Sequence, residues 1–219
     1  MNRKTSGDSA LIIYGGGGHG KAVIDLVRSL YTFDLVGIVD DGLPAGSQVL
    51  GVPVLGGKAV LAGLVSRGVR QAVNAVGGIG NIAPRVAVFE QLKIAGFGFP
   101  TLVHPSAVVE PSAGVAAGVQ IFPHAYVGSS AEVGFGCILN TGVILSHDCV
   151  LGDLVNISPG GILAGGVRVG ARTLIGMGVT INLDLNIGAD ARIGNGATVK
   201  ADVPPGGVVR AGGIWPERL

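Results

Sequence analysis

The sequence predicts an α/β domain followed by a coil of short parallel strands, and two observations carry this prediction. In the first hundred residues, short apolar runs alternate with amphipathic stretches of helical period, which is typical of βαβ units. From Val103 to Val199 an aliphatic residue then occupies every sixth position, seventeen times without an insertion. We therefore expect two domains, residues 1–100 and 101–219, joined at Phe99-Pro100-Thr101.

The first domain is expected to alternate strands and helices. Apolar runs predict buried strands at residues 11–14, 35–39 and 71–76. Amphipathic stretches predict helices at residues 21–30, 58–67 and 84–95. Residues 49–57, which contain Pro53, are expected to form a turn. Three strands joined by helices imply a small Rossmann-like parallel sheet, about half of a doubly wound dinucleotide fold.

A glycine-rich loop follows the first expected strand. Its sequence from Gly15 to Gly20 satisfies the G-x-G-x-x-G pattern, and Asp40 lies twenty residues beyond Gly20, where a dinucleotide fold places its ribose-binding acid. Glycines let the backbone approach phosphates, and the start of the next helix offers N–H groups to an anion. The loop favours a nucleotide or phosphate ligand without identifying it, and a tight turn without a ligand is the alternative.

The second domain repeats a unit of six residues, which is larger than one helical turn. The fourth residue after each aliphatic one is mostly small, so each repeat contributes two inward-facing residues; this second column includes Cys137, Cys149 and Val203. Polar or glycine-containing segments such as Gly128-Ser129-Ser130 suit the corners between strands. We expect both cysteines to be buried apolar fillers and not a disulfide or a metal site.

Composition and charge exclude several classes of function. Of 219 residues, 48% are hydrophobic and 13% charged, and the formal net charge is +1. No run of Lys or Arg occurs, which argues against nucleic acid or an anionic membrane surface as a partner. No apolar run reaches the length of a membrane span, and the first residues lack a signal-peptide core. We expect a cytoplasmic protein.

The two halves together resemble a known family over nearly the whole chain. The Gly-Gly-His-Gly loop, the Asp40-Asp41 pair, and the Asn140-Thr141 and His147-Asp148 motifs of the repeat are similar to those of the bacterial nucleotide-sugar N-acetyltransferases of the bacillosamine and perosamine pathways. They are also similar to the sialic-acid O-acetyltransferases grouped with them. The resemblance implies a left-handed parallel β-helix with three six-residue repeats per coil. It further implies acetyl-CoA as cosubstrate, a nucleotide-linked amino sugar as acceptor, and a homotrimer with active sites between subunits.

The resemblance also assigns roles to single residues. His147 matches the proposed general base of the family, and Asp148 stands where a glutamate is often found beside it. Gly165 matches a glycine whose backbone N–H meets the thioester carbonyl. The substrate-binding positions implied are Gly17, Gly18 and His19 of the nucleotide-binding loop, the acidic pair Asp40 and Asp41, and Asn140 near the acetyl group.

The repeat independently places these residues at one corner. If a coil contains three repeats, Gly165 and Gly166 lie on His147 and Asp148 in the next coil, so we expect a notch beside the imidazole with a backbone donor nearby. A neutral histidine takes a proton from an attacking amine or hydroxyl, and an N–H group stabilises the developing oxyanion. Asp148 would hold the imidazole tautomer, provided that the corner brings two adjacent side chains together.

The chain departs from the family pattern at Asn156. Many relatives carry a histidine in the motif that reads Asn156-Ile157-Ser158-Pro159-Gly160 here. An amide forms hydrogen bonds but does not titrate near neutral pH, so proton transfer is left to His147 alone. We expect Asn156 to bind substrate. The ending from Ala211 to Pro216 also departs from the family, which leaves the contacts to the CoA adenine unassigned.

The expected activity is transfer of acetyl from acetyl-CoA to the amino group of a nucleotide-linked 4-amino sugar, and three alternatives stay open. A hydroxyl acceptor, as in sialic-acid O-acetylation, would use the same residues. A β-helical carbonic anhydrase would need three zinc-binding histidines at one site, but His104, His124 and His147 share no corner column, and we expect no metal. A nicotinamide-dependent or nucleotide-sensing protein would depend on the Gly15 loop.

Overall fold

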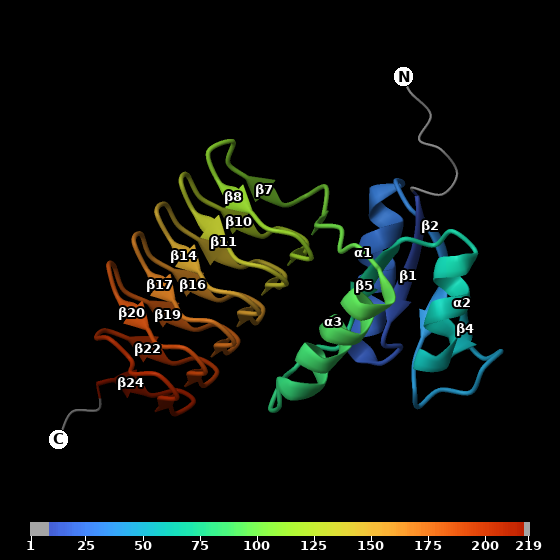
Figure 1. Cartoon of the computed structure of the whole chain (residues 1–219). Helices are drawn as coiled ribbons and strands as arrows, with labels where there is room; N and C mark the ends of the chain where they lie inside the picture. Colours follow the sequence, from blue (N-terminus) through green and yellow to red (C-terminus); the bar gives the residue numbers. More distant parts are fainter. Residues whose placement is uncertain (1–8, 217–219) are drawn as a thin grey trace. The chain divides into compact units, whose positions relative to one another are not determined.

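The computed structural model describes residues 9–216 and divides into two compact units between Pro100 and Thr101 (Figure 1). The first unit is α/β, and the second is built from short parallel strands that wind into three sheets. The predicted fold class, an α/β domain followed by a left-handed parallel β-helix, is confirmed. In the described part of the chain, no helix has the length and apolar character that crossing a bilayer requires.

The first unit is a five-stranded sheet with helices between its strands. Its elements are β1 (Ala10–Tyr14), α1 (Gly18–Leu30), β2 (Asp34–Val39), β3 (Gln48–Val49), β4 (Val52–Gly56), η1 (Lys58–Val60), α2 (Leu61–Ser66), β5 (Gln71–Asn74) and α3 (Ala83–Ala95). The strand order is β3-β4-β2-β1-β5, and all neighbours are parallel except β3 and β4. The chain therefore moves to one side of β1 through β2 and β4 and returns to its other side at β5.

Two expectations for this unit are wrong. Residues 49–57 form a hairpin and not only a turn, because the buried Val52 and Val54 alternate with the exposed Pro53 in the two-residue period of a strand. A proline is tolerated here because β4 pairs with β2 through Val54 and Gly56. Helix α1 also begins three residues earlier than predicted, at Gly18 and not at Lys21.

The sheet is buried on both faces. Ile12 and Tyr14 of β1 belong to one apolar cluster with Leu64 of α2 and Leu92 of α3. Leu11 and Ile13 point to the opposite face, because side chains alternate along a strand, and both are fully buried. Helix α1 contacts β1 and buries Val23, Ile24, Leu26 and Val27. Burial of this kind contributes roughly 1.5–3 kcal/mol per large aliphatic side chain.

The second unit contains three parallel sheets, each named here after one of its strands. The β12 sheet contains β6 (Leu102–Val103), β9 (Gln120–Ile121), β12 (Ile138–Leu139), β15 (Asn156–Ile157), β18 (Leu174–Ile175), β21 (Arg192–Ile193) and β23 (Val208–Val209). The β13 sheet contains β7 (Val108–Val109), β10 (Tyr126–Val127), β13 (Ile144–Leu145), β16 (Ile162–Leu163), β19 (Thr180–Ile181), β22 (Thr198–Val199) and β24 (Ile214–Trp215). The β14 sheet contains β8 (Gly114–Val115), β11 (Glu132–Val133), β14 (Val150–Leu151), β17 (Arg168–Val169) and β20 (Asn186–Ile187).

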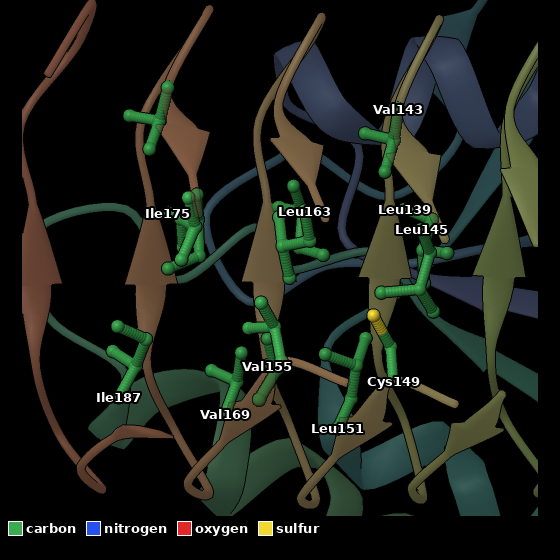
Figure 2. Close-up of a cluster of buried hydrophobic side chains, with 14 of the residues drawn as sticks. Leu139, Val143, Leu145, Cys149, Leu151, Val155, Leu163, Val169, Ile175 and Ile187 are labelled. Atoms are coloured by element: carbon green, nitrogen blue, oxygen red, sulfur yellow. The ribbon is translucent and has the colours of Figure 1, made fainter. Parts of the chain in front are cut away.

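One coil takes eighteen residues, as the pairing of Leu145 with Leu163 shows. The aliphatic residues at every sixth position fill the interior of the coil together with the smaller column, which includes Cys149 (Figure 2). Both cysteines are fully buried, as expected, and their thiols are free. The last coil is two residues shorter, because Val203 pairs with Ile187. The assignment of Val203 to the small column is therefore wrong.

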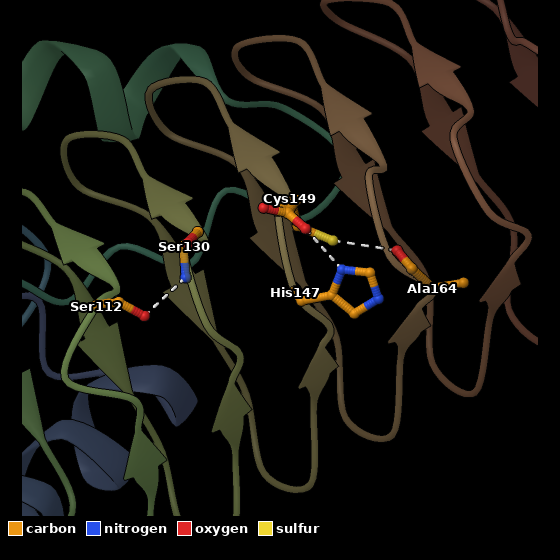
Figure 3. Close-up of polar contacts among 6 residues, drawn as sticks. Ser112, Ser130, His147, Cys149 and Ala164 are labelled. Carbon is orange, nitrogen blue, oxygen red and sulfur yellow. Dashed lines mark hydrogen bonds and ion pairs between the residues drawn. The ribbon is translucent and has the colours of Figure 1, made fainter.

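Corners between strands are closed by tight turns whose second residue has a positive φ. Among the described residues of this unit, glycine occupies nine such positions, and the seven other residues include Ser130 and Asp148, with φ values of 57° and 58°. Corner side chains also bond to the neighbouring coil: the Ser112 hydroxyl accepts a hydrogen bond from the Ser130 N–H at 3.0 Å (Figure 3). The corners thus present polar side chains on a rigid ladder of backbone.

Candidate active site

His147 and Asp148 form the corner that leads from β13 to β14. Nδ1 of His147 lies 2.7 Å from Oδ2 of Asp148, and both side chains are about two-thirds exposed, at 65% and 64% (Figure 3). Adjacent side chains in an extended strand point to opposite faces. Here the positive φ of Asp148 turns the backbone so that its carboxylate lies beside the imidazole. The corner conformation therefore creates the pair.

This hydrogen bond determines which nitrogen of His147 accepts a proton. A carboxylate only accepts hydrogen bonds, so Nδ1 carries the proton that it donates to Asp148. Nε2 of the neutral ring is then the free acceptor and the position of the base. When Nε2 takes up a proton, the negative charge of Asp148 stabilises the imidazolium.

Gly165 lies directly against this imidazole in the next coil. A Cβ atom placed on Gly165 would lie 2.4 Å from Cε1 and 2.5 Å from Nε2 of His147, so only glycine leaves room for the ring. The expected notch beside the imidazole is therefore filled by the imidazole itself, and Gly165 is buried. Gly166 donates its N–H to the carbonyl oxygen of His147 at 3.0 Å. Within residues 9–216, the Gly165 N–H has no hydrogen-bond acceptor.

Asn140 and Asn156 lie on the β12 sheet and contact each other. Nδ2 of Asn140 donates to Oδ1 of Asn156 at 3.1 Å and to the carbonyl oxygen of Ile157 at 2.7 Å. Asn140 precedes the corner into β13, whereas His147 follows β13. Four extended residues lie between Gly142 and His147, so the five steps from one to the other span roughly 16 Å at about 3.3 Å per residue. One chain therefore does not bring the Asn140 pair and His147 together.

The glycine-rich loop of the first unit joins β1 to α1 and is held by Asp40. Oδ2 of Asp40 accepts a hydrogen bond from the Gly16 N–H at 2.7 Å, and its Oδ1 accepts from the N–H groups of Gly42 and Leu43. Gly20 is required by packing, because a Cβ there would lie 2.2 Å from the carbonyl oxygen of Gly15. The carboxylate of Asp40 thus fixes the shape of the loop.

Gly17 and Gly18 face open space at the start of α1. A Cβ on either residue would meet no atom within 4 Å. Gly17 is the N-cap and makes no side-chain cap hydrogen bond, so the positive end of the α1 helix dipole faces this open space. His19 follows in the first turn, and Gly77 lies beside it: a Cβ placed on Gly77 would lie 3.7 Å from the Cβ of His19. Gly17, Gly18 and His19 thus lie together at the start of α1, and their role in binding a substrate stays a prediction.

Asp41 lies near this loop and is held by two donors. The Tyr14 hydroxyl donates to Oδ2 at 2.5 Å, and the Lys58 N–H donates to Oδ1 at 2.8 Å. Both bonds favour the ionised form and lower the pKa of the Asp41 carboxyl. Burial, together with the negative charge of Asp41, raises the pKa of the Tyr14 hydroxyl. Asp41 is therefore a fixed negative charge at the end of β2.

Sequence reasoning missed a second glycine-rich segment, residues 75–80, which follows β5. The strand order changes direction between β1 and β5, and ligands of open α/β sheets bind outside the carboxyl ends of strands at such a point. The β5 loop contains Gly78 and Gly80 in left-handed conformations, and its Gly77 borders His19. A glycine cluster directly after the third expected strand was the signal that could have identified it.

The described residues contain no group of three His, Cys, Asp or Glu side chains that could hold a metal ion. Burial raises the pKa of the Cys149 thiol, whose Sγ donates to the carbonyl oxygen of Ala164 at 3.1 Å (Figure 3). This thiol is therefore held in its neutral form, and we assign it to packing.

Comparison with known proteins gives consistent matches in both units. Residues 10–92 match the family model described as the PglD N-terminal domain. The chain is 29% identical to the GDP-perosamine N-acetyltransferase of Escherichia coli O157:H7 over 173 residues, which cover 77% of this chain and 76% of that protein.

Solved structures match over nearly the full length. One is a perosamine N-acetyltransferase from Caulobacter crescentus with CoA and GDP-perosamine, in which one histidine is replaced by asparagine; it has a TM-score of 0.86 and 34% identity, over 92% of this chain and 93% of that chain. Another is the acetyltransferase domain of PglB from Neisseria gonorrhoeae FA1090 with acetyl coenzyme A, with a TM-score of 0.85 and 34% identity, over 93% and 97%. The chain therefore belongs to the nucleotide-sugar N-acetyltransferases of the hexapeptide-repeat acyltransferase family.

Proposed function

We propose that this protein transfers the acetyl group of acetyl-CoA to the amino group of a nucleotide-linked 4-amino sugar, with His147 as the general base. The observation that carries the assignment of the base is the His147–Asp148 pair, in which the free Nε2 is the proton acceptor. Family membership and structural relatives that contain CoA and GDP-perosamine support the two substrates.

In the proposed reaction the amine attacks the thioester carbonyl while Nε2 of His147 removes its proton. A positioned general base contributes roughly 10²- to 10⁴-fold to the rate. The Gly165 N–H is the donor for the oxyanion of the tetrahedral intermediate, because it has no acceptor within the described chain. Collapse of the intermediate breaks the carbon–sulfur bond, and the CoA thiolate takes the proton from the imidazolium.

The two units divide the substrates in this proposal. Residues 1–100 bind the nucleotide sugar, with its phosphates at the N-terminus of α1 beside Gly17, Gly18 and His19. Residues 101–219 bind acetyl-CoA along the β-helix, next to Gly165 and Gly166. A cytoplasmic location is part of the proposal, because both cysteines remain free thiols, as is usual in a reducing compartment.

We further propose a homotrimer in which each active site is shared between two copies. Asn140 lies at the corner before β13 and His147 at the corner after it, so the two residues lie at opposite ends of the strands of the β13 sheet. A site that uses both residues therefore needs two chains. The outer face of this sheet also carries exposed aliphatic side chains: Val108, Ile144, Ile162 and Ile214. A heterologous ring of three copies would cover this face and place the His147 corner of one copy against the Asn140 corner of the next copy.

Replacement of His147 by alanine tests the assigned base. We expect H147A to bind CoA with nearly unchanged affinity, since the ring is exposed and makes one side-chain bond, while kcat falls at least 100-fold. Calorimetric CoA titration and thiol release from acetyl-CoA measure the two quantities. An unchanged kcat would show that His147 is not the general base.

The acceptor class is tested by a screen of nucleotide-linked 4-amino sugars with acetyl-CoA, read by thiol release. GDP-perosamine is the first compound, with its 4-hydroxy counterpart as the matched control. Turnover of the amine only supports N-acetylation, whereas turnover of sialic acid or of the hydroxyl compound only would show an O-acetyltransferase. A thermal shift with NAD and none with nucleotide sugars would contradict both the N-acetyltransferase and the O-acetyltransferase activity.

A further inference from the structure

The contact between Asn140 and Asn156 assigns a role to Asn156. Asn156 lies within β15 and is only 5% exposed, so its side chain is covered by protein. Asn140 follows β12, the neighbouring strand, and is partly exposed. Substrate could therefore reach Asn140 more easily than Asn156.

The carbonyl oxygen of Ile157 fixes the direction of the hydrogen bonds in this pair. A carbonyl oxygen only accepts, so the atom of Asn140 that lies 2.7 Å from it must be the nitrogen Nδ2. The second proton of Nδ2 is donated to Oδ1 of Asn156 at 3.1 Å. Both amide protons of Asn140 are then used within the chain. Among residues 9–216, no group donates a hydrogen bond to Oδ1 of Asn140.

On the basis of the proposed function, we propose that Asn156 is a positioning residue that fixes the Asn140 amide, so that Asn140 offers the attacking amine a hydrogen-bond acceptor only. An amine that gives one proton to a general base has another N–H to donate. Oδ1 of Asn140 accepts that N–H and orients the nitrogen lone pair toward the thioester. Asn156 acts through Asn140 and does not touch the substrate, which replaces the expected substrate-binding role.

An asparagine at this position suits the task because its acceptor does not titrate. The amide oxygen of Asn156 accepts from Asn140 at any pH near neutrality. An imidazole at the same position accepts only through an unprotonated nitrogen, and it becomes a donor on both sides when protonated. Asparagine at this position therefore keeps the orientation of Asn140 constant.

A double-mutant cycle tests the proposal in the full chain. We expect N140A and N156A each to lower kcat/KM for GDP-perosamine at least tenfold, and the double variant to be no worse than N140A, because Asn156 acts only through Asn140. Melting temperature and CoA binding of each variant serve as controls for folding. An N156A variant with unchanged kcat/KM, or single effects that multiply in the double variant, would overturn the proposal.

Two conservative variants test the direction of the bond. N156D keeps an oxygen that accepts from Asn140, so it should retain kcat/KM within a few-fold. N140D places a carboxylate oxygen against two acceptors, so it should lose at least as much as N140A. The opposite ranking would contradict the proposed orientation.

A measurement that needs no activity separates this inference from the proposed function. In protein labelled with ¹⁵N-asparagine, the Nδ2 protons of Asn140 should exchange slowly with solvent in the native chain and rapidly in N156A. Equal exchange rates would overturn the positioning role even if GDP-perosamine is a substrate. If exchange is slow in the native chain and rapid in N156A, but no nucleotide-linked amino sugar is turned over, Asn156 fixes the Asn140 amide and the proposed acetyltransferase function is wrong.

Discussion

At the level of single residues, the candidate catalytic corner depends on Gly165 as much as on its polar side chains. The position of the imidazole is set from one side by Asp148 and from the other by the backbone of the next coil. A displacement of about 1 Å at a catalytic group can lower the rate roughly 100-fold. The residue that leaves room for the ring therefore controls turnover without taking part in proton transfer.

We predict that G165A lowers kcat tenfold or more while the fold is kept. Gly165 does not require a left-handed conformation, so alanine fits its backbone, but the new Cβ would lie 2.4 Å from Cε1 of His147 and push the ring away. Steady-state kinetics and a melting curve measure the two effects. G114A is the matched control, since a Cβ there meets nothing within 4 Å. Equal kcat values in G165A and wild type would show that the ring position is not critical.

The sequence predicted which residues meet at this corner but not how they meet. The six-residue period places Gly165 one coil beyond His147, and the eighteen-residue pairing of Leu145 with Leu163 confirms that step. The bond between His147 and Asp148 depends on the positive φ of Asp148, which a polar residue type does not reveal. The burial of Asn156 could not be predicted either. The six-residue repeat identifies the residues that point into the coil, but it does not tell which outward-pointing residues are covered by other side chains.

At the level of elements, the loop between β1 and α1 combines glycines of two kinds. Gly20 is needed because the backbone of Gly15 lies against it, whereas Gly18 faces open space at the start of the helix. The first kind maintains the fold, and the second leaves room for a ligand. This difference allows the proposed nucleotide site to be tested separately from stability.

We predict opposite effects for alanine at these two positions. G20A should lower the free energy of unfolding by about 1–3 kcal/mol through overpacking. G18A should leave stability unchanged or slightly higher, because alanine favours a helix over glycine by up to about 1 kcal/mol, yet it should weaken GDP binding at least tenfold. Denaturant unfolding and calorimetric GDP titration distinguish them. Unchanged GDP affinity in G18A would show that the phosphates do not bind at the N-terminus of α1.

Elements were predictable where one period dominated the sequence. Strands β1, β2 and β5 lie close to their expected positions because each contains a continuous buried apolar run, and helices α2 and α3 do so because their buried residues recur once per turn. The β4 strand was missed because Pro53 suggested a turn, although it occupies the exposed side of a short strand. The shortened last coil was missed because Val203 fits either inward column by type, and only its pairing with Ile187 decides between them.

At the level of the whole molecule, the two proposed functional groups of the β-helix lie too far apart to act together within one chain. Asn140 precedes and His147 follows the extended segment that crosses the β13 sheet, and this segment spans about 16 Å from Gly142 to His147. If the proposed trimer is correct, Asn140 of one copy completes the site that contains His147 of another. Two variants that each lose most of their activity should then restore activity when they are mixed.

We predict that H147A and N140A regain activity when they are mixed under conditions that allow subunits to exchange. Each site takes His147 from one copy and Asn140 from its neighbour, so in a random equal mixture about one quarter of the sites carry both native residues. Thiol release should reach roughly a quarter of the wild-type rate, and unmixed variants and a mixture without exchange serve as controls. Mass photometry measures the oligomeric state. No recovery in verified mixed trimers would show that each chain builds its own site, and Asn140 would then have a structural role.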